Sequence, residues 1–417
     1  MAQQQQQSDP EAYLASALSS PQLPEELKPF YQAFSRFWSN RLWYQLTLTL
    51  STFLSHPLSA PFRIDLYHSF ISTFSAKLDP LAHAKLAVSV ARTYSEGAEA
   101  VAFLDGLLPE VSAPVPSTST STSTSVTPAS APSTTAPGPR LDPDLRAPRV
   151  LLTMERAHFL LLLGQADETK LAMERCEKVL DGLDGVDMEV NASFYRVGGD
   201  YWKAKAEFAS YYRSSLLYLA CIPLSSLTPS EAQSRAHDLG ISALLGSIYN
   251  FGELLQHPIL DVLEGTEGEM VKRVLEVFNR GDIRGFEGLV GVIGEKEPFL
   301  QQHFPFLREK ICLLALIEAV FKRPTSDRTL PFSVISQEAQ VPVEEVEHLV
   351  MKALSLHLLR ATLDAVSSTC TVSWVQPRVL DRTQIGQLKE RLGEWGDKVV
   401  AVEGVGREGG RGVVGLA

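Results

Sequence analysis

The order of short elements between residues 308 and 378 constrains the fold most. Each element is predicted by a local sequence pattern. The elements are an apolar helix, a brief extended piece after a polar turn at 324–326, two helices joined by a tight corner, and a hairpin. In order, they are a buried helix over Ile311–Phe321, an extended piece over Arg328–Pro331, helices over Ser333–Gln340 and Val343–Leu356 flanking Val341-Pro342, and strands over Leu358–Val366 and Thr369–Val375 flanking Ser367-Ser368. This order predicts a winged helix.

The charge of the second of these two helices argues against a nucleic-acid partner. Its first turns carry Glu344, Glu345 and Glu347, and Lys352 is the first basic residue after them. Carboxylates suit the positive end of a helix dipole, but they repel the phosphates that a recognition helix must approach. The whole chain has a net charge of -11, so no overall field favours a polyanion. We expect this element to dock on protein.

Composition indicates an ordinary soluble protein. The chain has 417 residues, 45% hydrophobic and 21% charged, enough for two or three domains. No apolar run is long enough to cross a bilayer, and the Gln-rich start lacks the features of a signal peptide. The four cysteines are isolated in sequence, which favours small buried side chains over disulfides or metal ligands. We therefore expect a protein of the cytoplasm and nucleus with no membrane partner.

Helical periodicity dominates residues 25–300 and predicts an α-solenoid of degenerate helical repeats. We expect residues 25–205 to form N-terminal repeats and residues 206–307 to form helices that lead into the winged helix. Residues 1–24 and the Ser/Thr/Pro-rich insertion 110–147 are expected to be disordered, because they cannot bury enough apolar area. The apolar residues of the first helix pair include Leu42 and Tyr44, and one helix is expected over Ala243–Leu255.

No motif for catalysis is found. The closest histidine pair near the C-terminus, His348 and His357, lacks metal-ligand spacing, and neither a nucleophile elbow nor a phosphate-binding loop occurs. Gly404, Gly406 and Gly409 match a dinucleotide fingerprint only formally, because too few residues follow for a helix and a second strand. We expect no enzyme activity, no catalytic residue, no cofactor and no metal.

A last amphipathic helix is expected over residues 379–402, with Asp381 as its N-cap, followed by a flexible Gly-rich tail over 403–417. The apolar residues of this helix recur at alternating intervals of three and four residues and so form one seam along it. Two interpretations of the seam remain open: it folds back on the chain's own winged helix, or it joins helices of other subunits. We expect the second interpretation. We also expect an open apolar face on the wing, which is the hairpin of the winged helix. The predicted interface residues are Ile385, Leu388, Leu392, Trp395 and Val399 on the helix, and Val372 and Trp374 on the wing.

Five segments are similar in sequence to known proteins: Arg41–Thr47, Ala209–Arg213, Asn250–Leu255 with His257-Pro258, Val346–Ser355 and Trp374–Asp381. They resemble the PCI-domain family, and within it the non-ATPase subunits of the proteasome regulatory-particle lid. The resemblance covers most of residues 25–398, with a PCI domain over 206–378 whose winged helix spans 308–378.

The resemblance implies a non-catalytic scaffold that supports lid assembly and ubiquitin-dependent protein degradation. In that family the winged helices pack edge to edge and the C-terminal helices gather in one bundle. The N-terminal repeats lie near the PCI neighbour subunit five and the ubiquitin receptor subunit ten. A PCI scaffold of the signalosome or of translation initiation factor three stays open as the alternative. Such a protein would share the fold but should lack the sequence of Trp374–Asp381.

Overall fold

The computed structural model describes residues 10–20, 23–112, 143–323, 328–376 and 382–414. The chain divides into two compact units, residues 1–226 and 227–417. The division falls after the boundary that we expected at residue 205. Among the described residues, the regular elements of the first unit are all helices, and those of the second are helices and one small sheet.

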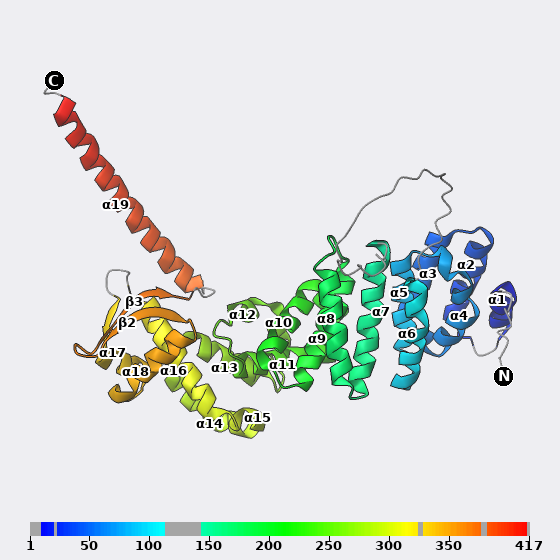
Figure 1. Ribbon diagram of the computed structural model, residues 1–417, viewed down its shortest axis with the longest axis horizontal. Coiled ribbons are helices and arrows are strands. Elements are labelled where there is room, and N and C mark those ends of the chain that lie inside the picture. The colour runs from blue at the N-terminus through cyan, green and yellow to red at the C-terminus, as the bar shows by residue number, and fades with distance from the viewer. Residues whose placement is uncertain (1–9, 21–22, 113–142, 324–327, 377–381, 415–417) are drawn as a thin grey trace, which may run out of the picture. The chain divides into compact units, whose positions relative to one another are not determined.

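The helices of the first unit lie side by side along the chain (Figure 1). Each buries an apolar face on its neighbours, as the periodicity predicted. The α-helices are α1 (Pro10–Ser19), α2 (Lys28–Ser39), α3 (Trp43–Ser55), α4 (Arg63–Ser69), α5 (Pro80–Ala91), α6 (Gly97–Ser112), α7 (Pro143–Leu162), α8 (Ala166–Leu180), α9 (Met188–Ala204) and α10 (Phe208–Cys221). Short 3-10 turns link some of them: η1 (Glu25–Leu27), η2 (Pro57–Phe62), η3 (Ile71–Lys77) and η4 (Leu224–Ser226).

Aromatic side chains form the core between the first four α-helices and η3. Phe34 of α2 meets Phe53 of α3 edge to face with ring centroids 5.7 Å apart, and Trp38 meets Phe74 at 5.3 Å. Such edge-to-face pairs add to the free energy gained from burying the rings. Leu42 and Tyr44 are not in this core: they are 40% and 81% exposed. The helix begins only at Trp43, which turns Tyr44 outward and places Leu46 and Leu50 inside.

The helices on either side of residues 113–142 pack directly against each other. Arg156 of α7 donates from Nε to Asp105 of α6 at 2.5 Å. Arg92, just after α5, donates from Nε and Nη2 to the two oxygens of the buried Glu155 carboxylate on α7, at 2.6 and 3.0 Å. Burial alone would raise the pKa of Glu155, but the hydrogen bonds and charge of Arg92 outweigh it and hold the pKa below its usual range. One array therefore continues across the insertion, whose Ser/Thr-rich part lies outside the described residues.

The second unit begins with a further set of helices. They are α11 (Pro229–Leu245), α12 (Gly252–Gln256), η5 (Pro258–Leu263), α13 (Glu269–Arg280), α14 (Ile283–Lys296), α15 (Pro298–Gln301) and α16 (Phe304–Phe321). Gly281 ends α13 with a φ of 66°, and an added Cβ would lie 2.9 Å from the Ala315 backbone of α16. Only glycine allows both the left-handed turn and this close approach.

A buried lysine ends α11. Nζ of Lys310, on α16, donates to the carbonyl oxygens of Ala243, Leu244 and Gly246 at 2.7, 2.9 and 2.7 Å. These are among the carbonyls that a helix C-terminus leaves without an internal partner. The helix that we expected over Ala243–Leu255 is therefore two helices: α11 stops at Leu245, and α12 starts at Gly252.

The surroundings of Lys310 act on its ammonium form in two opposite directions. The ring centroids of Phe251, Tyr249 and Phe306 lie 5.0, 5.4 and 5.9 Å from Nζ. Burial lowers the pKa of Lys310 to about 7. The three carbonyls, the negative end of the α11 dipole and the ring faces act in the opposite direction, and only an ammonium supplies three donors. Lys310 thus links α16 to α11 and to the 246–251 segment.

The winged helix has the predicted order of elements. α16 is followed by β1 (Thr329–Pro331), α17 (Phe332–Ala339), α18 (Val343–Ser355), β2 (Leu359–Asp364) and β3 (Thr369–Val375). The antiparallel sheet has the order β1-β3-β2, with β3 in the centre. On α18, Val346, Leu349, Val350 and Ala353 are buried, so one face of the helix packs in the core. β2 ends earlier than expected because the Asp364 carboxylate accepts from the amides of Val366 and Ser367, at 3.0 and 3.2 Å, and closes the turn. The polar turn expected at 324–326 lies outside the described residues.

The two chain ends differ from expectation. Within residues 1–24, which we expected to be disordered, α1 forms and buries Leu14, because this apolar side chain packs on the first core. At the other end, α19 (Arg382–Val414) continues through residues 403–414, where we expected a flexible tail. Gly404, Gly406 and Gly409 thus lie within a helix, not in a strand-to-helix loop. The predicted N-cap, Asp381, lies outside the described residues.

Candidate protein-interaction surfaces

The seam of α19 is the largest set of exposed apolar side chains on one element of the structure. All five predicted seam residues are described, and none is buried. Their exposed fractions are 53% for Ile385, 43% for Leu388, 59% for Leu392, 66% for Trp395 and 46% for Val399. A polar contact with the rest of the second unit runs from Arg391, off the seam, to the carbonyl oxygen of Lys322 at 3.2 Å. An apolar stripe of this extent in water is typical of an interface.

On the wing, only one of the two predicted interface residues is exposed to solvent. Trp374 is 39% exposed, whereas Val372 is 3% exposed and packs inside the winged helix, so the prediction of one open face with both residues is wrong for Val372. The reason is a β-bulge: Arg360 pairs with Trp374 and Ala361 with Val372, which leaves Ser373 as the extra residue. A bulge shifts the alternation of side chains by one, so Trp374 turns outward. The guanidinium of Arg360 lies over its ring, 5.3 Å from the centroid.

The three-stranded sheet has β3 at its centre, so β1 and β2 are its edges. β1 is only three residues long and ends in Pro331, which has no N–H to offer to another strand. β2 is six residues long, and the β3 strand pairs with one side of it. The other side of β2 is the edge more suited to adding a strand.

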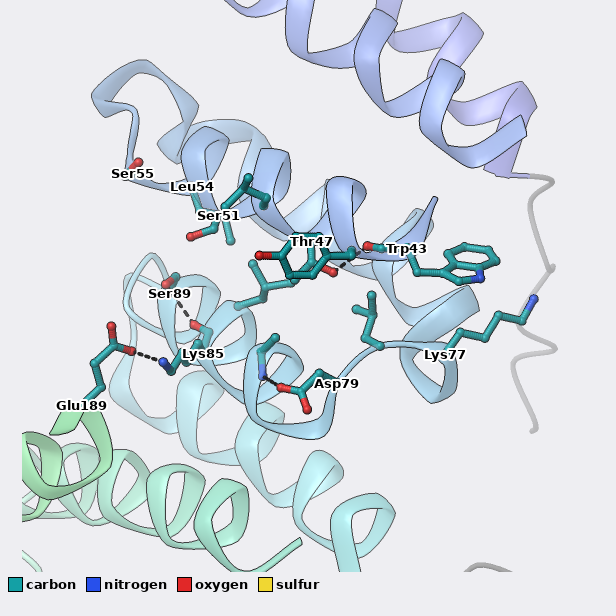
Figure 2. Close-up of a pocket in the computed structure, with 15 residues that line it drawn as sticks. Trp43, Thr47, Ser51, Leu54, Ser55, Lys77, Asp79, Lys85, Ser89 and Glu189 are labelled. Atoms are coloured by element: carbon teal, nitrogen blue, oxygen red, sulfur yellow. Dashed lines mark hydrogen bonds and ion pairs between the residues drawn. The ribbon is translucent and has the colours of Figure 1, made fainter. Parts of the chain in front are cut away.

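Sequence reasoning missed a groove in the first unit, between α3 and α5 (Figure 2). It has a volume of about 670 Å³, and the exposed side chains of Tyr44 and Leu48 line it. At one end the Lys77 ammonium lies 4.9 Å from the centroid of Trp43; at the other, Lys85 forms ion pairs with Asp187 and Glu189, both at 2.7 Å. The i, i+4 spacing of Tyr44 and Leu48 was the available signal, but spacing within one helix does not show that this face stays exposed in the folded unit.

Neither a cluster of metal-ligand side chains nor a membrane-spanning helix is found in the part of the chain that the structure describes. Among the described residues, no group of three or more His, Cys, Asp or Glu side chains is placed to hold a metal ion. Within the same residues, no helix combines the length and hydropathy that a membrane span requires.

Helical repeats that lead into a winged helix define a PCI-type protein, and the comparison with known families agrees. The family described as "PSD13 N-terminal repeats" matches residues 30–275, and the family described as "PCI domain" matches residues 295–374. The chain belongs to the family of the 26S proteasome non-ATPase regulatory subunit 13.

Curated relatives match almost end to end. The 26S proteasome non-ATPase regulatory subunit 13 homolog A of Arabidopsis thaliana is 37% identical over 380 residues, 90% of this chain and 92% of the relative. The 26S proteasome regulatory subunit RPN9 of Saccharomyces cerevisiae is 36% identical over 376 residues, 89% of this chain and 91% of the relative. The alternative that we left open is distant: translation initiation factor 3 subunit M of Emericella nidulans is 26% identical over 196 residues, 44% of this chain and 42% of the relative.

Proposed function

We propose that this chain is a non-catalytic structural subunit of the proteasome regulatory-particle lid, and that it supports lid assembly and ubiquitin-dependent protein degradation. The observation that carries the proposal is the exposed apolar seam of α19, on a chain whose relatives along nearly its whole length are proteasome regulatory subunits. A seam of this kind supplies binding free energy by apolar burial and needs no chemistry. The proposed location is the cytoplasm and nucleus.

The proposed partners follow from the family. The α19 seam, with Ile385, Leu388, Leu392, Trp395 and Val399, joins a bundle of C-terminal helices from other lid subunits. The winged helix contacts a neighbouring subunit through its wing, where Trp374 is the exposed anchor. The first unit lies near the PCI neighbour subunit five and the ubiquitin receptor subunit ten.

The wing contact predicts a change in hydrogen exchange. We expect the amides of β2 and the residues around Trp374 to exchange more slowly in the assembled complex than in the free chain, because an added strand or packed surface covers an open edge. The measurement is hydrogen–deuterium exchange on the full chain, alone and in the purified complex. Amides of α5, packed inside the first unit, serve as the internal control and should not change. Equal exchange of the wing in both states would remove the wing from the interface.

The function as a whole is tested by what the chain carries with it from its own cells. A lid subunit brings proteasomal subunits, a signalosome subunit brings that complex, and an initiation-factor subunit brings the other subunits of that factor. Purification through a tag on the full chain therefore separates the proposal from both alternatives.

A further inference from the structure

A second groove of the first unit combines basic walls with an apolar floor. It lies along α7 and α8, beside the end of α6, and has a volume of about 610 Å³. Five cationic side chains line it: Arg146, Arg149, Arg156, Arg175 and Lys178. None of its described lining residues is acidic, although the chain as a whole has a net charge of -11. This local reversal of charge is what distinguishes the groove.

The basic residues are placed by helical spacing. Arg146, Arg149 and Arg156 occupy positions i, i+3 and i+10 of α7, which bring them to one face. Arg175 and Lys178 are three residues apart near the end of α8 and form the opposite wall. The α7 row extends over about 15 Å, at 1.5 Å per residue. The walls are therefore long enough for several side chains of a bound peptide.

Most of this charge is available to a ligand. Arg156 is already paired with Asp105 at 2.5 Å, so it acts at the edge of the groove. Arg149, Arg175 and Lys178 are exposed. The positive charge in the groove therefore does not depend on Arg156.

The floor selects among anionic ligands. It is made by Leu108, Val150, Cys176 and Val179, which are apolar. No aromatic side chain is among the described lining residues, whereas grooves for single-stranded nucleic acid use aromatic rings to stack bases. A small phosphate would leave the apolar floor uncovered. A peptide that alternates carboxylates with aliphatic side chains satisfies both the walls and the floor.

We propose that the α7–α8 groove is a docking site for an acidic, amphipathic segment of a partner protein. Carboxylates of that segment pair with Arg149 and Arg175 on the two walls, and its aliphatic side chains cover Val150 and Val179. The site is separate from the α19 seam and the wing, and it does not depend on the proposed lid function.

Fluorescence anisotropy on the full chain tests the proposal. The probe is a fluorescein-labelled peptide of about a dozen residues in which pairs of Glu alternate with Leu, long enough as a helix to follow the α7 row. Two comparison peptides carry Lys in place of Glu, or Ser in place of Leu. We expect only the Glu/Leu peptide to bind, with an affinity that falls as salt is added.

Charge reversal on the two walls is the decisive variant. Arg149→Glu with Arg175→Glu should weaken binding at least about tenfold, because attraction on both walls becomes repulsion. Lys170→Glu with Lys205→Glu is the matched control: it makes the same change in net charge at exposed positions of the first unit outside the groove, and it should bind like the wild type. Equal losses in both variants, or no binding to the wild type, would overturn the proposal.

Two further outcomes identify a different occupant. If a chain lacking residues 113–142 binds the peptide more tightly than the full chain, residues 113–142 compete with the peptide for the groove. If inorganic polyphosphate of equal total charge displaces the peptide as well as unlabelled peptide does, the apolar floor contributes nothing and the partner is not an amphipathic peptide. Either result would contradict the proposal.

Discussion

The double substitution Leu388→Asp with Leu392→Asp should abolish entry into the complex while leaving the fold of the chain intact. Both side chains are exposed on the free chain, so their replacement removes little buried area, and we expect the Tm to stay within about 2 °C of the wild type. In the complex, burying each leucine contributes about 1.5–3 kcal/mol, and an aspartate there also costs desolvation. Together these losses correspond to a decrease in affinity of more than about a hundredfold. The measurements are thermal unfolding of the variant and its recovery in affinity-purified complex.

The control keeps the charge change and moves it off the seam. Lys389→Gln with Lys398→Gln lowers the net charge by two, as the aspartates do, at exposed positions on the other faces of α19. This variant should assemble normally. If the aspartate variant unfolds, the seam packs within the chain; if it assembles like the control, the seam is not an assembly element.

The substitution Lys310→Met should cause the largest loss of stability of any single change in the second unit that we predict. It keeps an unbranched side chain that is only one atom shorter but leaves the carbonyls of Ala243, Leu244 and Gly246 without their donor. Each buried carbonyl without a partner costs on the order of 1–3 kcal/mol, so we expect a loss of about 3 kcal/mol or more. For a unit of this size, that loss lowers the Tm by roughly 6–12 °C.

Lys296→Met is the matched control for this change, because Lys296 is exposed on the same unit and its substitution should change the Tm by no more than about 2 °C. Thermal unfolding followed by circular dichroism measures both variants. A Lys310→Met variant as stable as the control would show that the ammonium is not needed to end α11.

The winged helix could be predicted from the sequence because each of its elements has a strong local signal. The all-apolar run of α16, the i, i+3, i+4, i+7 stripe of α18 and the serine turn are properties of neighbouring residues. The position of α12 could not be predicted in the same way. Its separation from α11 depends on Lys310, which follows Gly246 by more than sixty residues, and no local pattern contains that contact.

The candidate site was predicted in part for a similar reason. The α19 seam is a local pattern, and the structure places all five of its residues in the open. The exposure of Val372 and Trp374 depends on the pairing of β3 with β2. The bulge at Ser373 places these two side chains on different sides of the strand. The α3–α5 groove and the α7–α8 groove were missed because they lie between helices, and periodicity within one helix does not show which neighbour covers it.

Quantitative purification of the tagged chain from its own cells tests the central claim most directly. The proposal predicts that proteasomal ATPases and the other lid subunits copurify with the chain in equimolar amounts, and that the Leu388→Asp, Leu392→Asp variant recovers none of them. Recovery of initiation-factor or signalosome subunits in place of proteasomal subunits, or of the chain alone under conditions that keep the proteasome intact, would contradict it.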